Sequence, residues 1–310
     1  MLFFPYKLAI NLYRLPYLTV LVCLVCLTTF LSQQKSASAF GRNLNAYCTQ
    51  ETDANLHAIL ESIDDASVGR GCANVFMAIR DSHDHDKEIA ELAREIRGLD
   101  FYRDKDEDLR YKQAALSSGY ANFETLVPRQ LTDKLAYGTD RYDFVTMLTS
   151  TFAHAGWSHL LGNLLFFFIF ASCVESALGT VNFSLVFVTM AIVTSLAYSY
   201  SVPAADVLPS IGLSGVAMGM MAMLTTMLPR AKIWCFFWFL LYVRRFTLPV
   251  LVIAAWYVGW NVYDLTHHDP SSHINYMAHV SGAVTGFVLG AVYRLFAPQR
   301  LESVALGMNS

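Results

Sequence analysis

Charged side chains are scarce in this sequence. Of its 310 residues, only 15% are Asp, Glu, Lys or Arg, whereas 55% are hydrophobic. An ordinary soluble domain carries about 25% charged residues, so a soluble domain over the whole length is excluded and a polytopic membrane protein is predicted. The few charges are unevenly placed, because residues 33–145 hold 20 of the 25 acidic and 14 of the 22 basic side chains. That segment is predicted to be a separate soluble insert.

Metal-binding motifs are also missing. The sequence has no HExxH, and no CxxC is paired with a second CxxC or with a pair of histidines. We therefore expect no metal. We also expect no other cofactor and no nucleic-acid partner. Four of the six cysteines lie in apolar stretches, where they are expected to pack as small side chains. Cys48 and Cys72 are the two in the insert. They can form a disulfide if the insert is extracytoplasmic, but their spacing alone does not decide this.

Long apolar runs are abundant and predict an all-α protein with six membrane-spanning helices. A span needs about 20 apolar residues, and the predicted spans are Leu15–Leu31, Ser158–Leu178, Val181–Tyr200, Ser214–Pro229, Thr247–Leu265 and Ala278–Phe296. The first is interpreted as a signal anchor in preference to a signal peptide cleaved after residues 37–39. The run Ile233–Val243 has only eleven residues, with basic residues on both sides. It is predicted to be interfacial or re-entrant.

These spans predict four regions. Residues 1–32 hold the N-terminus and first span, and residues 33–142 form the insert, in which Lys87–Leu99 has helical spacing of apolar residues. The other spans form a core at residues 143–297, followed by a tail at 298–310. With a cytoplasmic N-terminus, all eight basic residues outside the insert fall on the cytoplasmic side. The insert then lies outside, and Ser214 and His279 lie near the outer ends of two spans.

A serine and a histidine in apolar spans each need a polar partner, because lipid offers none. Ser214 lies in Gly212-Leu213-Ser214-Gly215, where the glycines permit a sharp entry into a helix and close approach of a substrate backbone. Taken alone, this tetrapeptide favours a serine bonded to its own helix or simple small-residue packing. A serine paired with a neutral imidazole, however, is an activated nucleophile. No acidic residue is placed to orient His279, so a dyad is expected.

Two further groups accompany the dyad. His159 and Asn163 are four residues apart, so both project from one helix face and can stabilise an oxyanion alongside the Ser214 amide. The alternative is a polar contact between helices. His154 and His159 are five apart and do not share a helix face. His279 begins a stripe continued by Gly282, Gly286 and Gly290, which is typical of tight helix–helix contact.

The motifs HAGWSHLLGN, GLSG and AHVSGAVTG across six spans resemble those of the rhomboid intramembrane serine proteases, over about residues 143–297 plus the first span. The resemblance implies a six-helix bundle, with Ser214 as nucleophile, His279 as general base, and His159, Asn163 and Ser214 in the oxyanion hole. It implies supporting roles for residues around them and a structural role for Glu175 and Gly179. The supporting residues are Gly212, Gly215, His154, Met218 and Gly282.

This chain departs from the family pattern at Met218, where family members commonly have an aromatic residue that stacks on the catalytic histidine. A thioether can pack against imidazole.

The predicted activity is that of an endopeptidase that cleaves transmembrane segments in the lipid bilayer near the extracytoplasmic face. The alternative is an inactive rhomboid-like protein that binds membrane clients. A bacterial inner membrane is the expected location, and the sequence predicts no oligomeric state.

Overall fold

The computed structural model describes residues 2–8, 15–51, 53–64, 71–138, 142–201, 209–239, 242–267, 274–297 and 301. Its contacts divide the chain into two compact units. One combines Met1–Gln33 with Thr132–Ser310 and is called the helical unit below; the other is Gln34–Leu131, called the insert unit. The predicted tail at 298–310 lies outside the described residues except for Leu301.

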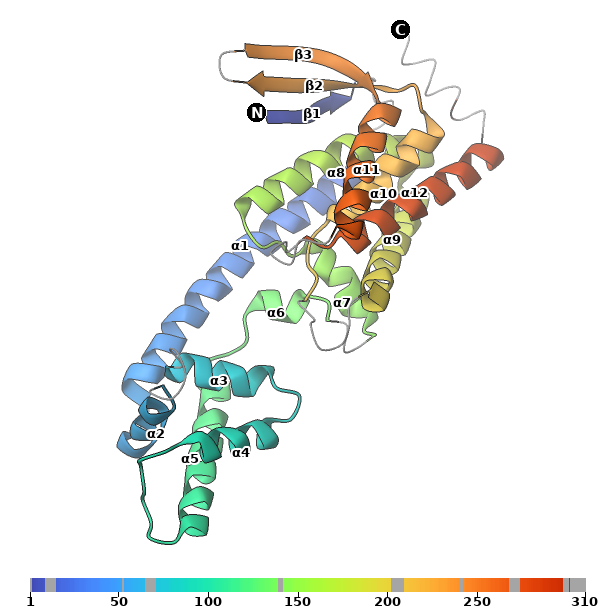
Figure 1. Cartoon of the computed structure of the whole chain (residues 1–310). Coiled ribbons are helices and arrows are strands. Elements are labelled where there is room, and N and C mark those ends of the chain that lie inside the picture. The colour runs from blue at the N-terminus through green and yellow to red at the C-terminus, as the bar shows by residue number, and fades with distance from the viewer. Residues whose placement is uncertain are drawn as a thin grey trace. The chain divides into compact units, whose positions relative to one another are not determined.

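The helical unit is built from apolar helices, as predicted. Within the described residues, four helices are long and apolar enough to cross a membrane. They are α1 (Tyr17–Ala46), whose residues after Gln33 belong to the insert unit, α8 (Trp157–Leu178), α9 (Thr180–Ser201) and α12 (Tyr276–Phe296). The predicted fourth and fifth spans correspond to the shorter helices α10 (Ser214–Met227) and α11 (Val250–Thr266), of 14 and 17 residues. The chain is therefore a polytopic helical membrane protein, with α10, α11 and α12 in mutual contact (Figure 1).

The run Ile233–Val243, predicted to be interfacial or re-entrant, forms strands, which the all-α prediction did not include. It contributes to two strands of a three-stranded antiparallel sheet made of β1 (Leu2–Leu8), β2 (Lys232–Phe239) and β3 (Tyr242–Pro249), in the order β1-β2-β3. Phe236 pairs with Phe4 on one side and with Arg245 on the other. Aromatic residues favour strands, and eleven residues are too few for a spanning helix. The sheet pairs the N-terminal strand with a strand more than 220 positions later, which the local pattern could not reveal.

The insert unit is helical and has its own hydrophobic core. Its helices are α2 (Ala54–Asp64), α3 (Cys72–Asp81), α4 (His85–Glu95) and α5 (Lys105–Leu126), preceded by the π-helical turn Tyr47–Glu51. The helix predicted at Lys87–Leu99 is thus present as α4, ending four residues earlier than expected. A disulfide joins Cys48 to Cys72. Short helices α6 (Leu131–Leu135) and α7 (Phe144–Thr149), then a 3-10 turn (Ser150–Phe152), lead into α8.

Glu175 is the one acidic residue buried among the described residues of the spanning helices, and it joins α8 to the beginning of α1. Its carboxylate accepts hydrogen bonds from the Leu18 amide at 2.9 Å, and from the Thr19 amide and hydroxyl, both at 2.7 Å. The first amides of a helix lack internal partners and favour negative charge. Glu175 therefore has the structural role that the family pattern implied.

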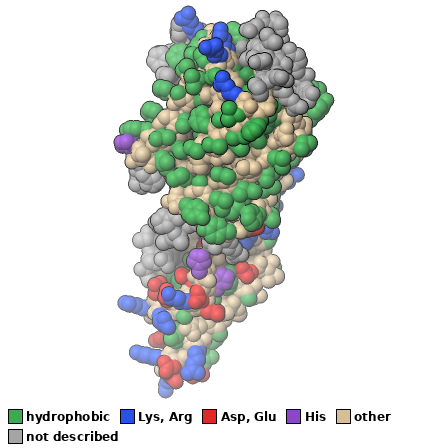
Figure 2. All heavy atoms as spheres, turned by 90° about the vertical axis from the view of Figure 1, so that its right-hand side faces the viewer, with side chains coloured by type: hydrophobic (Ala, Val, Ile, Leu, Met, Phe, Trp, Pro, Cys, Tyr) green, Lys and Arg blue, Asp and Glu red, His purple; other side chains and the backbone are tan. Residues whose placement is uncertain are grey.

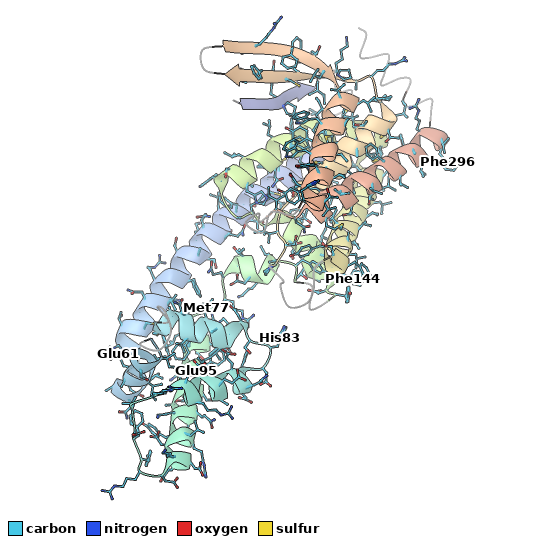
Figure 3. All side chains as sticks on the ribbon, in the orientation of Figure 1. Glu61, Met77, His83, Glu95, Phe144 and Phe296 are labelled. Carbon is cyan, nitrogen blue, oxygen red and sulfur yellow. A yellow bond between two sulfur atoms is a disulfide. The ribbon has the colours of Figure 1, made fainter. Side chains whose placement is uncertain are left out.

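The surface of the helical unit is suited to lipid. Figure 2 shows hydrophobic side chains covering the visible face of this unit, with Lys and Arg gathered at one end. Exposed apolar residues include Val181, Leu185, Val284, Val288 and Val292. Phe296 projects outward at the end of α12 and is 84% exposed (Figure 3). In a bilayer such side chains are buried in the acyl chains, whereas basic residues mark a membrane boundary.

Candidate active site

The loop before α10 lies directly against α8. Gly212 has φ +121°, and its amide donates to the Ser150 carbonyl at 2.9 Å. A Cβ added to Gly212 would lie 2.9 Å from His159 Cε1 and 3.8 Å from Asn163 Nδ2. Both the positive φ and the close approach require glycine. His159 and Asn163 thus lie next to Gly212, which is two positions before Ser214 in the sequence.

The beginnings of α10 and α12 also meet at glycines. A Cβ on Gly215 would lie 3.1 Å from the Ala278 carbonyl oxygen, and one on Gly282 would clash with the Gly215 carbonyl. Further along, a Cβ on Gly286 would clash with the Gly219 carbonyl. The prediction that the glycine stripe packs against another helix is therefore confirmed. The contact begins at Gly215 and Ala278, which are the sequence neighbours of Ser214 and His279.

Ser214 is the first residue of α10, and Leu213 before it provides no side-chain cap. The amides of a first helical turn have no partner within the helix. They are therefore available to a negatively charged group. Among the described residues, Ser214 Oγ and the His279 ring do not form a direct hydrogen bond. Such bonds are often long without substrate and shorten in the Michaelis complex.

His279 has a hydrogen-bond partner that the sequence analysis missed. Its Nδ1 lies 2.6 Å from Oδ1 of Asn261, on α11. Asn261 was not predicted to orient His279, because only acidic residues were considered for that role, although an asparagine in an apolar span is itself an unusual feature.

His159 and Asn163 on α8 each have an N–H group that can donate a further hydrogen bond. The Ala155 amide donates to His159 Nδ1 at 3.4 Å, and since an amide can only donate, the His159 ring must carry its proton on Nε2 when neutral. Asn163 is buried, and its Nδ2 has no hydrogen-bond partner among the described residues. Unpaired buried donors are costly and rare in native structures. These two nitrogens could donate to an oxygen that becomes negatively charged.

His154 supports this region from the segment before α8. It is buried, its ring lies edge-on to His159 with centroids 5.2 Å apart, and its Nδ1 donates to the Phe152 carbonyl at 3.2 Å. Gln33 fixes its backbone, since the His154 amide donates to Gln33 Oε1 at 3.1 Å and Gln33 Nε2 donates back at 3.3 Å. Burial, followed by the nearby His159, lowers the His154 pKa to about 4. His154 is therefore neutral at pH 7.

Met218 is buried in the helical core. The aromatic ring that does lie beside the histidine belongs to Tyr276, whose centroid is 6.4 Å from that of His279 in an edge-on arrangement. This distance is within the range of favourable aromatic contacts. Tyr276 comes from the first turn of the same helix as His279, and the sequence analysis did not single it out.

The fold and site together define a polytopic helical membrane protein with a serine, two histidines and an asparagine near the ends of three helices. Residues 141–296 match the family model "Rhomboid domain", and the chain belongs to the rhomboid family. It is 29% identical over 148 residues to rhomboid-like protein 11, chloroplastic, of Arabidopsis thaliana, covering 48% of this chain and 51% of that protein. It is 30% identical over 153 residues to rhomboid protein 1, mitochondrial, of Saccharomyces cerevisiae, covering 47% and 41%.

A third relative, the presenilin-associated rhomboid-like protein, mitochondrial, of Mus musculus, is 26% identical over 148 residues, covering 45% of this chain and 36% of that protein. The chain thus matches about half or less of the length of these curated relatives. Their names place them in mitochondria or chloroplasts. The expectation of a bacterial inner membrane is therefore not supported; what stands is an integral membrane protein.

Proposed function

We propose that this protein is an intramembrane serine endopeptidase that cleaves transmembrane segments of other membrane proteins. The observation that carries the proposal is the meeting of three distant segments: residues 159–163 of α8 at Gly212, and the beginnings of α10 and α12 at Gly215. In this proposal Ser214 is the nucleophile and His279 the general base. The Ser214 amide, His159 Nε2 and Asn163 Nδ2 form the oxyanion hole.

The chemistry follows from these roles. Ser214 Oγ attacks the scissile carbonyl as its proton passes to His279 Nε2. The oxygen of the tetrahedral intermediate takes the negative charge, next to the α8 donors. When the carbon–nitrogen bond breaks, His279 returns the proton to the leaving amine. A water molecule then hydrolyses the acyl-enzyme by the same steps, so no metal or cofactor is required.

The two histidines differ in a way that supports these roles. His159 accepts an amide proton at Nδ1, so its Nε2 is a donor. His279 has an acceptor oxygen at Nδ1, so its Nε2 is free to accept. An oxyanion hole needs the first arrangement and a general base the second.

The position of the site in the membrane is part of the proposal. With the N-terminus in the cytoplasm, Ser214 lies below the opposite surface, on the side of the insert. The disulfide within the insert supports an oxidising compartment on that side. A substrate helix must unwind locally before attack, because its own hydrogen bonds shield the peptide bond. We expect cleavage near small or helix-breaking residues.

The main competing function is a rhomboid-like protein that binds membrane clients without cutting them. Labelling with a fluorophosphonate in detergent distinguishes the two. We expect labelling of the wild type and its loss, by at least about 100-fold in rate, in both Ser214→Ala and His279→Ala. Ser184→Ala is the matched control, since the one hydrogen bond of this hydroxyl within the described residues is to the Thr180 carbonyl of its own helix. Wild-type labelling and cleavage of a model transmembrane substrate by Ser214→Ala would contradict the proposal.

A further inference from the structure

Asn261 makes two hydrogen bonds that together fix the orientation of its side-chain amide. Its Nδ2 donates to the Tyr257 carbonyl, four residues earlier in α11, at 2.8 Å. Its Oδ1 lies 2.6 Å from His279 Nδ1. A flipped amide would place Oδ1 against the Tyr257 carbonyl oxygen, two acceptors facing each other, so the orientation with Oδ1 toward His279 is favoured.

This orientation determines where the neutral imidazole carries its proton. An amide oxygen can only accept, so His279 Nδ1 must be protonated to complete the bond. The Nε2 lone pair then remains free, which is the form that can take a proton from Ser214. The other tautomer would present an N–H to the serine and could not act as a base.

We propose that Asn261 is a positioning residue that holds His279 in the Nδ1-protonated tautomer and in the ring orientation required of the base. The inference rests on the proposed function and extends it: the expected dyad becomes a chain of three side chains, Ser214, His279 and Asn261. In serine proteases of the Ser-His-Asp type a buried carboxylate performs this task. Here a neutral amide does so, which avoids placing a charge in an apolar span.

The bond also links two helices, because Asn261 is on α11 and His279 on α12. The described part of the chain offers a comparison at Asn182 on α9, whose Nδ2 donates to the Leu178 carbonyl at 3.2 Å, again four residues earlier. Asn182 therefore makes the same kind of bond to the carbonyl four residues earlier, although that carbonyl belongs to the last residue of α8, and it is 97 positions from His279 in the sequence. It serves as a control for the loss of an asparagine bond to the carbonyl four residues earlier.

The test compares Asn261→Ala, Asn261→Asp and Asn182→Ala in the full-length protein, by steady-state cleavage of a model transmembrane substrate. We expect Asn261→Ala to lower kcat about 100-fold, with KM changed less than about threefold, since general-base catalysis contributes factors of this size or more. Asn261→Asp keeps an acceptor oxygen, so its kcat should be at least about tenfold higher than that of Asn261→Ala. Asn182→Ala should retain wild-type kcat.

A spectroscopic measurement keeps the proposal testable even if Asn261→Ala does not fold. In wild-type protein with 15N-labelled histidine, the His279 signal, assigned by its loss in His279→Ala, should show the proton on Nδ1. A proton on Nε2 would overturn the inference, as would wild-type kcat in Asn261→Ala. If one of these overturning results is obtained and Ser214→Ala is inactive in the same assay, the proposed function stands while this inference fails. If Ser214→Ala is active, the proposed function itself fails.

Discussion

The contact between α10 and α12 and the core of the insert unit hold helices together by opposite means. Between α10 and α12, glycines face the partner backbone, so that a Cβ on Gly282 or Gly286 would meet a carbonyl of α10. In the insert, large aromatic rings fill the space between helices. Phe76 stacks on Phe123 with centroids 5.2 Å apart, and Arg80 lies over the Phe123 ring at 4.3 Å.

The difference reflects the two solvents. In lipid, burying an apolar side chain between helices gains little, so close backbone packing and polar contacts hold the helices together. In water, burial of large apolar side chains is the main driving force. The insert adds a disulfide and an ion pair that is buried on both sides. The contribution of each of these interactions to stability can be measured by substitution.

The largest effect is expected at Asp108 in the insert. Its carboxylate accepts from Lys112 Nζ at 2.6 Å and from the Phe101 and Tyr102 amides at 2.6 and 3.2 Å, and both charged side chains are almost fully buried. Asp108→Ala leaves a buried ammonium and two amides without partners. We expect the insert to lose about 3–5 kcal/mol of stability. Hydrogen exchange of α4 and α5 in the full-length protein measures this.

The control for that experiment is Glu107→Ala, an exposed acidic residue in the same helical turn, with an expected loss of less than about 1 kcal/mol. The same site predicts a pH dependence. Burial alone would raise the pKa of Asp108, but the bonds from Lys112 and the two amides hold its pKa below its usual value. Its contribution is therefore complete above about pH 4 and is lost as the pH falls further. Equal exchange rates in Asp108→Ala and Glu107→Ala would contradict the stabilising role of Asp108.

The disulfide is expected to contribute somewhat less. Cys48 and Cys72 are 24 residues apart, and closing a loop of this size stabilises a protein by about 3 kcal/mol through the unfolded state. We expect the double variant Cys48→Ser/Cys72→Ser to raise exchange in α2 and α3 while leaving α10 and α12 unchanged. Cys23→Ser, which removes a free cysteine, should alter neither. Increased exchange in α10 and α12 of the double variant would show that the disulfide acts beyond the insert.

The same contrast explains which parts of the fold were predictable. Apolar runs and charge distribution identified the helical membrane bundle, because lipid imposes a composition that is visible in one sequence. The sheet was missed, since β1 and β2 pair across more than 220 positions of sequence and no local pattern encodes such a pairing. The local pattern of β2 was interpreted as an interfacial segment because only its length and flanking charges were considered.

In the candidate site, the residues that the sequence predicts are those with rare chemistry for their surroundings. Ser214, His279, His159 and Asn163 were chosen because polar groups in apolar helices need partners. Asn261 meets the same criterion and was missed, because only acidic groups were considered for orienting a histidine. Its partner is 18 residues away, on the next helix. Helical spacing cannot reveal a contact between two helices.

The smallest effect on stability is expected in the membrane region, at Gly286. A methyl group there meets the Gly219 backbone, whereas one at Gly259 in α11 meets nothing within 4 Å. Gly286→Ala should push α12 away from α10 and cost about 1–3 kcal/mol, seen as a lower Tm in detergent. Since Ser214 and His279 adjoin this helix contact in the sequence, fluorophosphonate labelling should slow as well. Gly259→Ala should leave both unchanged, and equal Tm values would show that close glycine packing is not what holds α10 against α12.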